Sequence, residues 1–346
     1  MDKKDIVSLT LPELREEIVS MGESGFRAGQ IYQWLHKSAV TDFSEMTNLS
    51  KSLREKLAET FELYRCTIEK KLESVYDGTV KYLFRLNDGE FIESVVMKYK
   101  YGYTICVSSQ VGCKMGCKFC ASTKAGFVRN LRPSEILWQV YAAQKDLDIR
   151  ISHIVLMGVG EPMDNFDNVM RFLELISDEN GLNIGMRNIS LSTCGVVDGI
   201  YKLLEKDLQL TLSISLHAPS DEIRSTTMPV NHRWNIDTLL KACRDYAAAT
   251  SRRISFEYAM ISGVNDSDEC ARLLAGKLRG MLCHVNLIPV NEVDGTGCKK
   301  SSPQRLERFR QLLEQSGITV TVRRTLGSDI NASCGQLRIR HEKTNG

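Results

Sequence analysis

Hydrophobic and polar residues follow helical spacing in the first part of this chain and strand spacing in the part after it. Three stretches place apolar residues at the i, i+3, i+4 spacing of a helix: residues 11–20, 27–36 and 49–58. Three further stretches read as strands and are separated by Asp-Gly turns: residues 67–75, 81–85 and 91–98. The pattern therefore predicts a small helical module followed by a three-stranded β-meander.

From residue 103 onward, short apolar stretches typical of strands alternate with longer stretches typical of amphipathic helices. The predicted strands are 103–108, 153–157, 188–192, 209–216, 253–258, 284–288 and 318–322. The predicted helices are 133–142, 169–176, 197–204, 236–248, 269–278 and 303–314. Strands that alternate with helices form a parallel sheet, whose functional residues gather at the carboxyl ends of the strands.

This order of elements indicates an α/β fold with three parts. We expect a helical accessory domain at residues 1–64 and a β-meander linker at residues 65–98. The remaining residues, 99–346, are expected to form an open or partial (β/α)6 barrel followed by a C-terminal loop.

The composition is that of a globular protein and argues against several classes. Of the 346 residues, 42% are hydrophobic and 25% are charged, and no apolar run approaches the length of a membrane span. The first residues lack the apolar core of a signal peptide, and the 11 cysteines are not spaced as in small disulfide-rich domains. We therefore expect a cytoplasmic, monomeric protein with reduced thiols and no membrane partner.

Charge gives little guidance about a nucleic-acid partner. The net charge is only +2, so binding of RNA would depend on local basic patches. The helical module offers one such patch, made of Lys37, Lys51, Arg54 and Lys56. A solvated helix surface explains these residues equally well.

Three cysteines lie within eight residues, at Cys113, Cys117 and Cys120. A structural zinc site is closed by four ligands, and no fourth ligand lies nearby in the sequence. Three thiolates on an iron–sulfur cluster leave one iron open for a further ligand. The spacing therefore favours a cluster, with a zinc site completed by a distant residue as the alternative.

The Cys-x-x-x-Cys-x-aromatic-Cys loop, with its flanks 104–112 and 121–126, resembles the RlmN/Cfr family of radical S-adenosylmethionine (SAM) RNA adenine methyltransferases. The resemblance covers nearly the whole chain and is most specific between residues 93 and 336. It implies a 4Fe-4S cluster bound by Cys113, Cys117 and Cys120, with an open iron for SAM. It also implies two SAM molecules per turnover and an electron donor such as flavodoxin or ferredoxin.

The carboxyl ends of the predicted strands carry glycine and polar residues, above all the Gly-Val-Gly-Glu-Pro run at 158–162. Glycines let the backbone approach a ligand, and the carboxylate of Glu161 can accept from an amino group. A dinucleotide-binding loop is a weaker interpretation, because its third glycine is missing. The resemblance implies that SAM contacts Gly160, Glu161, Ser192, Ser215, Leu216, His217 and Asn291.

Two more cysteines and one glutamate are candidates for the chemistry. Cys106 lies on the first barrel strand, Cys334 lies in a glycine-flanked loop after the last one, and Glu93 interrupts an apolar strand. From the residues alone, both cysteines could be ordinary buried thiols and Glu93 an outward-facing residue of an edge strand. The resemblance implies instead that the cysteines are catalytic and that Glu93 or Cys106 accepts a proton.

The implied reaction transfers a methyl group first to Cys334 and then, as a carbon radical, to an adenine through a covalent protein–RNA adduct. Attack by Cys106 on Cys334 releases the product and leaves a disulfide. The motifs Gly-Glu-Pro and Ser-Thr-Cys-Gly-Val-Val favour the RlmN branch. That branch implies methylation of carbon 2 of an adenosine in 23S rRNA and of an adenosine beside the anticodon in tRNA.

Three alternatives remain at this stage. A Cfr-like enzyme would methylate carbon 8 of the adenine instead. A radical SAM enzyme with another substrate would give Cys106 and Cys334 no paired role. A zinc-bearing, ribosome-associated RNA-binding protein would need no SAM at all.

Overall fold

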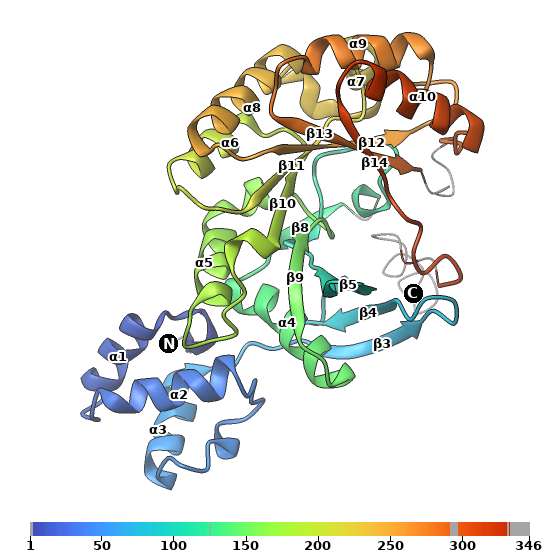
Figure 1. The fold of residues 1–346 in the computed structure, drawn as a ribbon. Helices are drawn as coiled ribbons and strands as arrows, with labels where there is room; N and C mark the ends of the chain where they lie inside the picture. Colours follow the sequence, from blue (N-terminus) through green and yellow to red (C-terminus); the bar gives the residue numbers. More distant parts are fainter. Residues whose placement is uncertain (1–2, 125, 291–296, 331, 333–346) are drawn as a thin grey trace.

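One ten-stranded sheet runs through the computed structural model, which describes residues 3–124, 126–290, 297–330 and 332 (Figure 1). Its order from edge to edge is β14-β13-β12-β11-β10-β9-β6-β5-β4-β3. Every neighbouring pair from β6 to β14 is parallel. Within the described residues the two edge strands do not pair with each other, so the predicted open, partial barrel is confirmed.

The strands and helices of the barrel lie close to their predicted positions. The parallel strands are β6 (Gly102–Cys106), β9 (Ile151–Leu156), β10 (Ile189–Thr193), β11 (Thr211–Ser215), β12 (Ile254–Met260), β13 (Cys283–Pro289) and β14 (Thr319–Val322). The helices are α4 (Pro133–Leu147), α5 (Phe166–Ser177), α6 (Val197–Leu204), α7 (Asp221–Thr227), α8 (Ile236–Thr250), α9 (Asp268–Leu278) and α10 (Pro303–Gln315). Of these, the sequence prediction missed α7. No described helix is long and apolar enough to cross a membrane.

The predicted β-meander is confirmed, and it continues the barrel sheet. It consists of β3 (Thr67–Glu73), β4 (Val80–Arg85) and β5 (Phe91–Tyr99), which pair antiparallel. Strand β5 also pairs antiparallel with β6, so residues 67–99 lie in the same sheet as the barrel strands. Because β5 has a neighbour on both sides, the alternative that Glu93 is an outward-facing residue of an edge strand is wrong.

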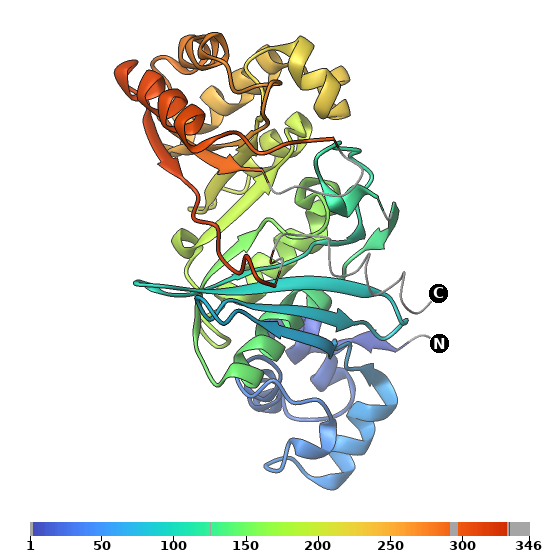
Figure 2. The ribbon, with the colours of Figure 1, turned by 90° about the vertical axis from the view of Figure 1, so that its right-hand side faces the viewer.

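The N-terminal module packs against α4 and α5, at the bottom of the view in Figure 2. Its helices are α1 (Leu11–Ser20), α2 (Phe26–His36) and α3 (Lys51–Thr60), and β1 (Lys4–Asp5) pairs with β2 (Phe61–Glu62). Thr10 caps α1, since its side chain accepts from the Glu13 N–H. Polar contacts fix the module to the barrel; among them, His36 Nδ1 lies 2.8 Å from the Tyr141 hydroxyl, and Arg171 binds Glu13 at 2.7 Å.

The chain after β14 crosses the open side of the barrel and reaches the β3–β4 turn (Figure 1). There the Gly327 N–H donates to the Asp77 carboxylate at 2.9 Å. The carboxylate of Asp329 accepts from the Ser74 hydroxyl at 2.7 Å and from the Val75 N–H at 3.0 Å. These contacts anchor the segment that precedes Cys334 to the meander.

Candidate active site

The three clustered cysteines follow β6 on a loop that is enclosed by a short hairpin. The hairpin, which we call the cluster hairpin, is made of β7 (Gln110–Gly112) and β8 (Phe127–Asn130). Gly112 has φ +76°, and a Cβ there would overlap the carbonyl of Gly126, so only glycine fits. The Cys113 N–H donates to that same carbonyl at 3.0 Å and closes the loop.

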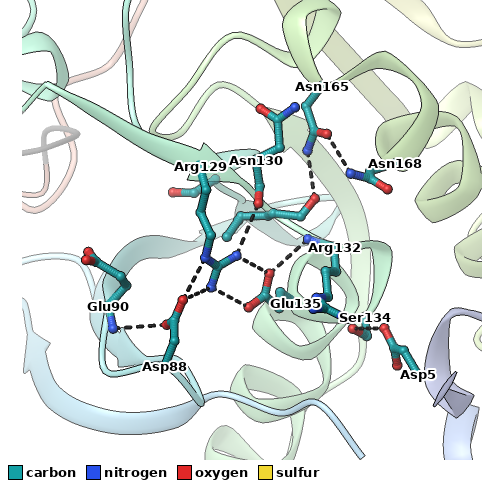
Figure 3. A network of polar contacts seen from close by, with 12 residues as sticks. Asp5, Asp88, Glu90, Arg129, Asn130, Arg132, Ser134, Glu135, Asn165 and Asn168 are labelled. Carbon is teal, nitrogen blue, oxygen red and sulfur yellow. Dashed lines mark hydrogen bonds and ion pairs between the residues drawn. The ribbon is translucent and has the colours of Figure 1, made fainter. Parts of the chain in front are cut away.

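A polar network fixes the cluster hairpin to three other parts of the molecule (Figure 3). Arg129 on β8 binds both carboxylate oxygens of Glu135 on α4 at 2.8 Å, and it binds Asp88 in the β4–β5 turn at 2.7 Å. Beside them, the Ser134 hydroxyl donates to Asp5 of the N-terminal module at 2.6 Å. The base of the cysteine loop is therefore held directly by α4 and the meander, and by the module through α4.

Cys113, Cys117 and Cys120 line one cavity of about 270 Å³. Burial raises the pKa of Cys113 to about 12 and also raises that of Cys117, so these thiols stay protonated until a positive metal centre offsets the burial. Within the described residues, no three His, Cys, Asp or Glu side chains are arranged to hold a single metal ion. Three thiols spread over one cavity fit a cluster, in which each thiolate binds a different iron.

The predicted glycine-rich loop lies directly against the cysteine loop. A Cβ on Gly160, which has φ +108°, would lie 2.6 Å from the Gln110 side chain, and one on Gly158 would lie 2.5 Å from the Val107 carbonyl. These glycines therefore let the loop approach β6 closely, and both line the cavity.

Glu161 brings a buried carboxylate to the cavity. It accepts from the Cys194 N–H at 2.7 Å and from the Met163 N–H at 3.1 Å. Burial raises the pKa of Glu161, and these hydrogen bonds work against that rise. The carboxylate makes no ion pair with any described residue, so a cationic ligand group in the cavity would balance its charge.

The ends of β10 and β11 supply the next part of the cavity wall. Ser192, Ser215 and His217 line it, whereas Leu216 packs into the hydrophobic core behind them. His217 has φ +56° and accepts from the Ala259 N–H through Nδ1 at 2.9 Å. Burial, followed by the charge of Arg224, lowers the pKa of His217 to about 3, so the ring is neutral and Nε2 carries the proton.

Cys106 faces the barrel interior on the opposite, meander side. Register pairs it with Val95 on β5, and Val95 pairs with Lys81 on β4, so these three residues project from the same face of the sheet. Cys106 is 4% exposed and packs with Val95, Met97 and Met157. Because Met157 also lines the cavity of the cysteine loop, the two regions are continuous.

Glu93 lies on that same face and forms a buried ion pair. Its carboxylate is 2.9 Å from the ammonium of Lys81, and the two side chains are only 3% and 1% exposed. Sequence reasoning found Glu93 as a charge within an apolar strand but missed Lys81, which begins the neighbouring strand. We call Lys81, Glu93 and Cys106 the meander wall, and the cysteine loop with Glu161, Arg224 and His217 the cluster wall.

The structure leaves two predicted residues undescribed and adds others. Cys334 and Asn291 lie outside the described residues, so their roles stay predictions. Glu257 and Arg323 also line the cavity, and burial raises the pKa of Glu257. A glutamate within the apolar strand at 253–258 was a usable signal for Glu257, of the kind that identified Glu93. Arg224, which belongs to the cluster wall but does not line the cavity, gave no such signal.

Known proteins match this chain over nearly its whole length, and two family models match separate parts of it. A family model described as ribosomal RNA large subunit methyltransferase N-terminal domain matches residues 4–63, and one described as radical SAM superfamily matches residues 107–274. A protein of Alkaliphilus oremlandii named probable dual-specificity RNA methyltransferase RlmN is 55% identical over 341 residues, which cover 99% of each chain. A protein of Clostridium novyi with the same name is 53% identical over 342 residues, covering 99% of this chain and 100% of that one.

A solved structure has the same fold over nearly the whole length. The crystal structure of a radical SAM methyltransferase from Sphaerobacter thermophilus matches with a TM-score of 0.91 and 42% sequence identity. The match covers 96% of this chain and 98% of the other.

Proposed function

The chain belongs to the RlmN family of radical SAM RNA methyltransferases, and from this premise we propose that it methylates carbon 2 of adenosine in RNA. The substrates are an adenosine in 23S rRNA and an adenosine beside the anticodon in tRNA. The names of the relatives favour this activity over Cfr-like methylation at carbon 8. The observation that carries the proposal is the continuity between the cavity of the cysteine loop and the apolar cluster around Cys106.

The cluster wall is suited to hold the cluster and SAM. Cys113, Cys117 and Cys120 are the cluster ligands in this proposal, and Glu161 binds the amino group of SAM. When bound, the cluster and SAM supply a carbon-centred radical. Methylation of adenine carbon 2 requires a radical because this electron-poor carbon is not a nucleophile and cannot attack the methyl group of SAM directly. The neutral His217 offers an N–H donor rather than a second positive charge, as a site for a sulfonium ligand requires.

Cys334 and Cys106 are the proposed catalytic cysteines. Leu326 and Ala332 of the anchored C-terminal segment pack against the group of hydrophobic side chains that contains Cys106. Cys334 follows Ala332 by two residues in the sequence, and two residues of extended chain span at most about 7 Å. The position of Ala332 therefore supports the proposal that Cys334 acts together with Cys106. The Cys334 thiolate takes a methyl group, and the carbon of that group later forms the bond to the adenine.

Glu93 is the proposed proton acceptor and Lys81 its positioning residue. After the new carbon–carbon bond forms, carbon 2 must lose its proton to a nearby base. A carboxylate bound to a buried ammonium has a fixed position on the same face as Cys106. Attack by the Cys106 thiolate on the Cys334 sulfur then breaks the carbon–sulfur bond. The released methylene carbon takes up a proton to become the methyl group, and the two cysteines are left as a disulfide, which external thiols reduce.

The experiment is anaerobic methylation of a 23S rRNA fragment and a tRNA transcript by the cluster-loaded protein, followed by mass spectrometry of the nucleosides. We expect 2-methyladenosine from both RNAs. Detection of 8-methyladenosine would indicate Cfr-like chemistry instead, and no methylated adenosine from either RNA would overturn the proposal. Product from one RNA alone would restrict the substrate range.

A further inference from the structure

Arg224 is a fully buried cation that is surrounded by neutral acceptors. It lies on α7, whose first turn is capped by Ser220, and it has no exposed surface. Its guanidinium donates to the carbonyls of Leu216 (3.1 Å), Ser215 (3.4 Å) and Cys194 (2.6 Å) and to the side-chain oxygen of Asn231 (3.0 Å). These four bonds go to uncharged oxygen atoms, so they do not neutralise the charge.

No carboxylate among the described residues forms an ion pair with Arg224. Asp221 acts on it only at longer range, and its carboxylate accepts instead from the Ile236 N–H at 2.8 Å. Glu161 and Arg224 both bind the backbone of Cys194, whose carbonyl accepts from Arg224 and whose N–H donates to Glu161. A buried charge without a partner is costly, so a cation in this position requires an anion that the described part of the chain does not supply.

The cysteine loop lies beside this guanidinium. The Lys118 N–H donates to the Thr227 carbonyl at 2.9 Å, which fastens the loop to the end of α7. Cys117 packs with Met228 and Val230, just after the same helix, and its sulfur interacts electrostatically with Arg224. The position where three thiolates would bind a cluster is therefore next to the unpaired cation.

We propose that Arg224 is the counter-ion of the thiolate-bound iron–sulfur cluster and raises the reduction potential of that cluster. A cluster held by three thiolates is an anion, and reduction makes it more negative, so a nearby buried cation favours the reduced form. Arg224 is then a positioning residue with two effects. Its hydrogen bonds join the ends of β10 and β11, and its charge adjusts the energy of electron uptake.

The first test is a redox titration of the cluster followed by electron paramagnetic resonance, with dithionite as reductant. It compares the wild-type protein with Arg224→Gln, Arg224→Lys and the control Arg233→Gln, which removes an equal charge from an exposed site. We expect a more negative potential for Arg224→Gln, a value nearer wild type for Arg224→Lys, and no shift for the control. A wild-type potential in an Arg224→Gln protein with full iron content would overturn the proposal.

The second test covers variants that take up the cluster poorly. Cluster assembly from iron and sulfide is measured together with the unfolding midpoint of each protein before and after assembly. We expect assembly to raise the midpoint more for wild type and Arg224→Lys than for Arg224→Gln, or Arg224→Gln alone to assemble no cluster. Equal gains, or a Lys variant that assembles no better than the Gln variant, would mean that hydrogen bonding and not charge matters.

This inference rests on the proposed function, because it requires the cluster. The two fail in different ways. A wild-type protein that binds no iron would defeat the proposed function, whereas a normal cluster that does not respond to Arg224 would defeat this inference and leave the proposed function intact.

Discussion

The meander wall and the cluster wall both carry buried charges, but they balance these charges differently. On the meander wall, Lys81 and Glu93 are bound to each other at 2.9 Å. On the cluster wall, Glu161 accepts from the N–H of Cys194 and Arg224 donates to the carbonyl of the same residue, and neither forms an ion pair with any described residue. This difference indicates which wall binds charged ligands. The two charges of the meander wall neutralise each other, whereas the cluster wall is completed by a cationic group at Glu161 and an anionic group at Arg224.

The largest expected effect follows from removing a cluster ligand. The variant Cys117→Ala should lose its iron and reduce RNA methylation to background, because two remaining thiolates do not retain the cluster. Iron analysis and the nucleoside assay measure both effects. The control is Cys283→Ala, a half-buried thiol outside the cavity, which should keep both properties. Normal iron content in Cys117→Ala would contradict the proposal that the cysteines of the cluster wall bind the iron–sulfur cluster.

Breaking the charge pair of the meander wall should cost stability even without cofactors. The variant Lys81→Met leaves the buried Glu93 carboxylate without its partner, and such changes typically cost about 3–5 kcal/mol. Urea unfolding of the cofactor-free protein measures this loss. The double variant Lys81→Met/Glu93→Gln should recover part of it. A single variant as stable as wild type would show that the pair is not the closed unit described above.

Removing the carboxylate of the cluster wall should instead act on SAM binding. The variant Glu161→Gln replaces a charged hydrogen-bond acceptor by a neutral one, which should weaken SAM binding by about 10- to 100-fold. Equilibrium binding of SAM to the cluster-loaded protein is the measurement. The exposed Glu205→Gln serves as the charge control. Unchanged affinity in Glu161→Gln would mean that the amino group of SAM is bound elsewhere.

His217 gives the cluster wall a smaller effect, which depends on pH. Its ring binds a proton near pH 6.5 in the unfolded chain but only near pH 3 in the folded one. The unfolded chain therefore binds the proton more readily than the folded one. As the pH is lowered from 7 to 5, the free energy of unfolding decreases by roughly 2 kcal/mol.

Urea unfolding at these two pH values tests the role of His217. The variant His217→Asn, which tolerates the positive φ, should lose less stability on acidification than wild type. The exposed His232→Asn is the control and should behave as wild type. An equal acid-induced loss in His217→Asn would assign the pH dependence to other groups.

Local features of the structure were predictable from the sequence. The predicted start of α10 at Pro303 and the strand periods depend on neighbouring residues only, and both are confirmed. The rule that parallel strands end at one rim also brought the cysteine loop, Glu161 and His217 together correctly.

Features that depend on register and convergence were not predictable. Whether Glu93 faces water depends on whether β5 is an edge strand, and its partner Lys81 depends on the alignment of β4 with β5. Arg224 lies on a helix of seven residues, too short to show a period. Its burial depends in part on the loop at Cys194, which is 30 residues away in the sequence, so no local pattern predicts that Arg224 is buried.

The most direct test of the central claim is to look for RNA bound covalently to the Cys106→Ala variant. After anaerobic reaction with SAM and RNA, the account predicts an adduct that mass spectrometry assigns to Cys334. The adduct should be absent from the double variant Cys106→Ala/Cys334→Ala. Release of methylated RNA by Cys106→Ala at the wild-type rate, with no adduct, would contradict the account.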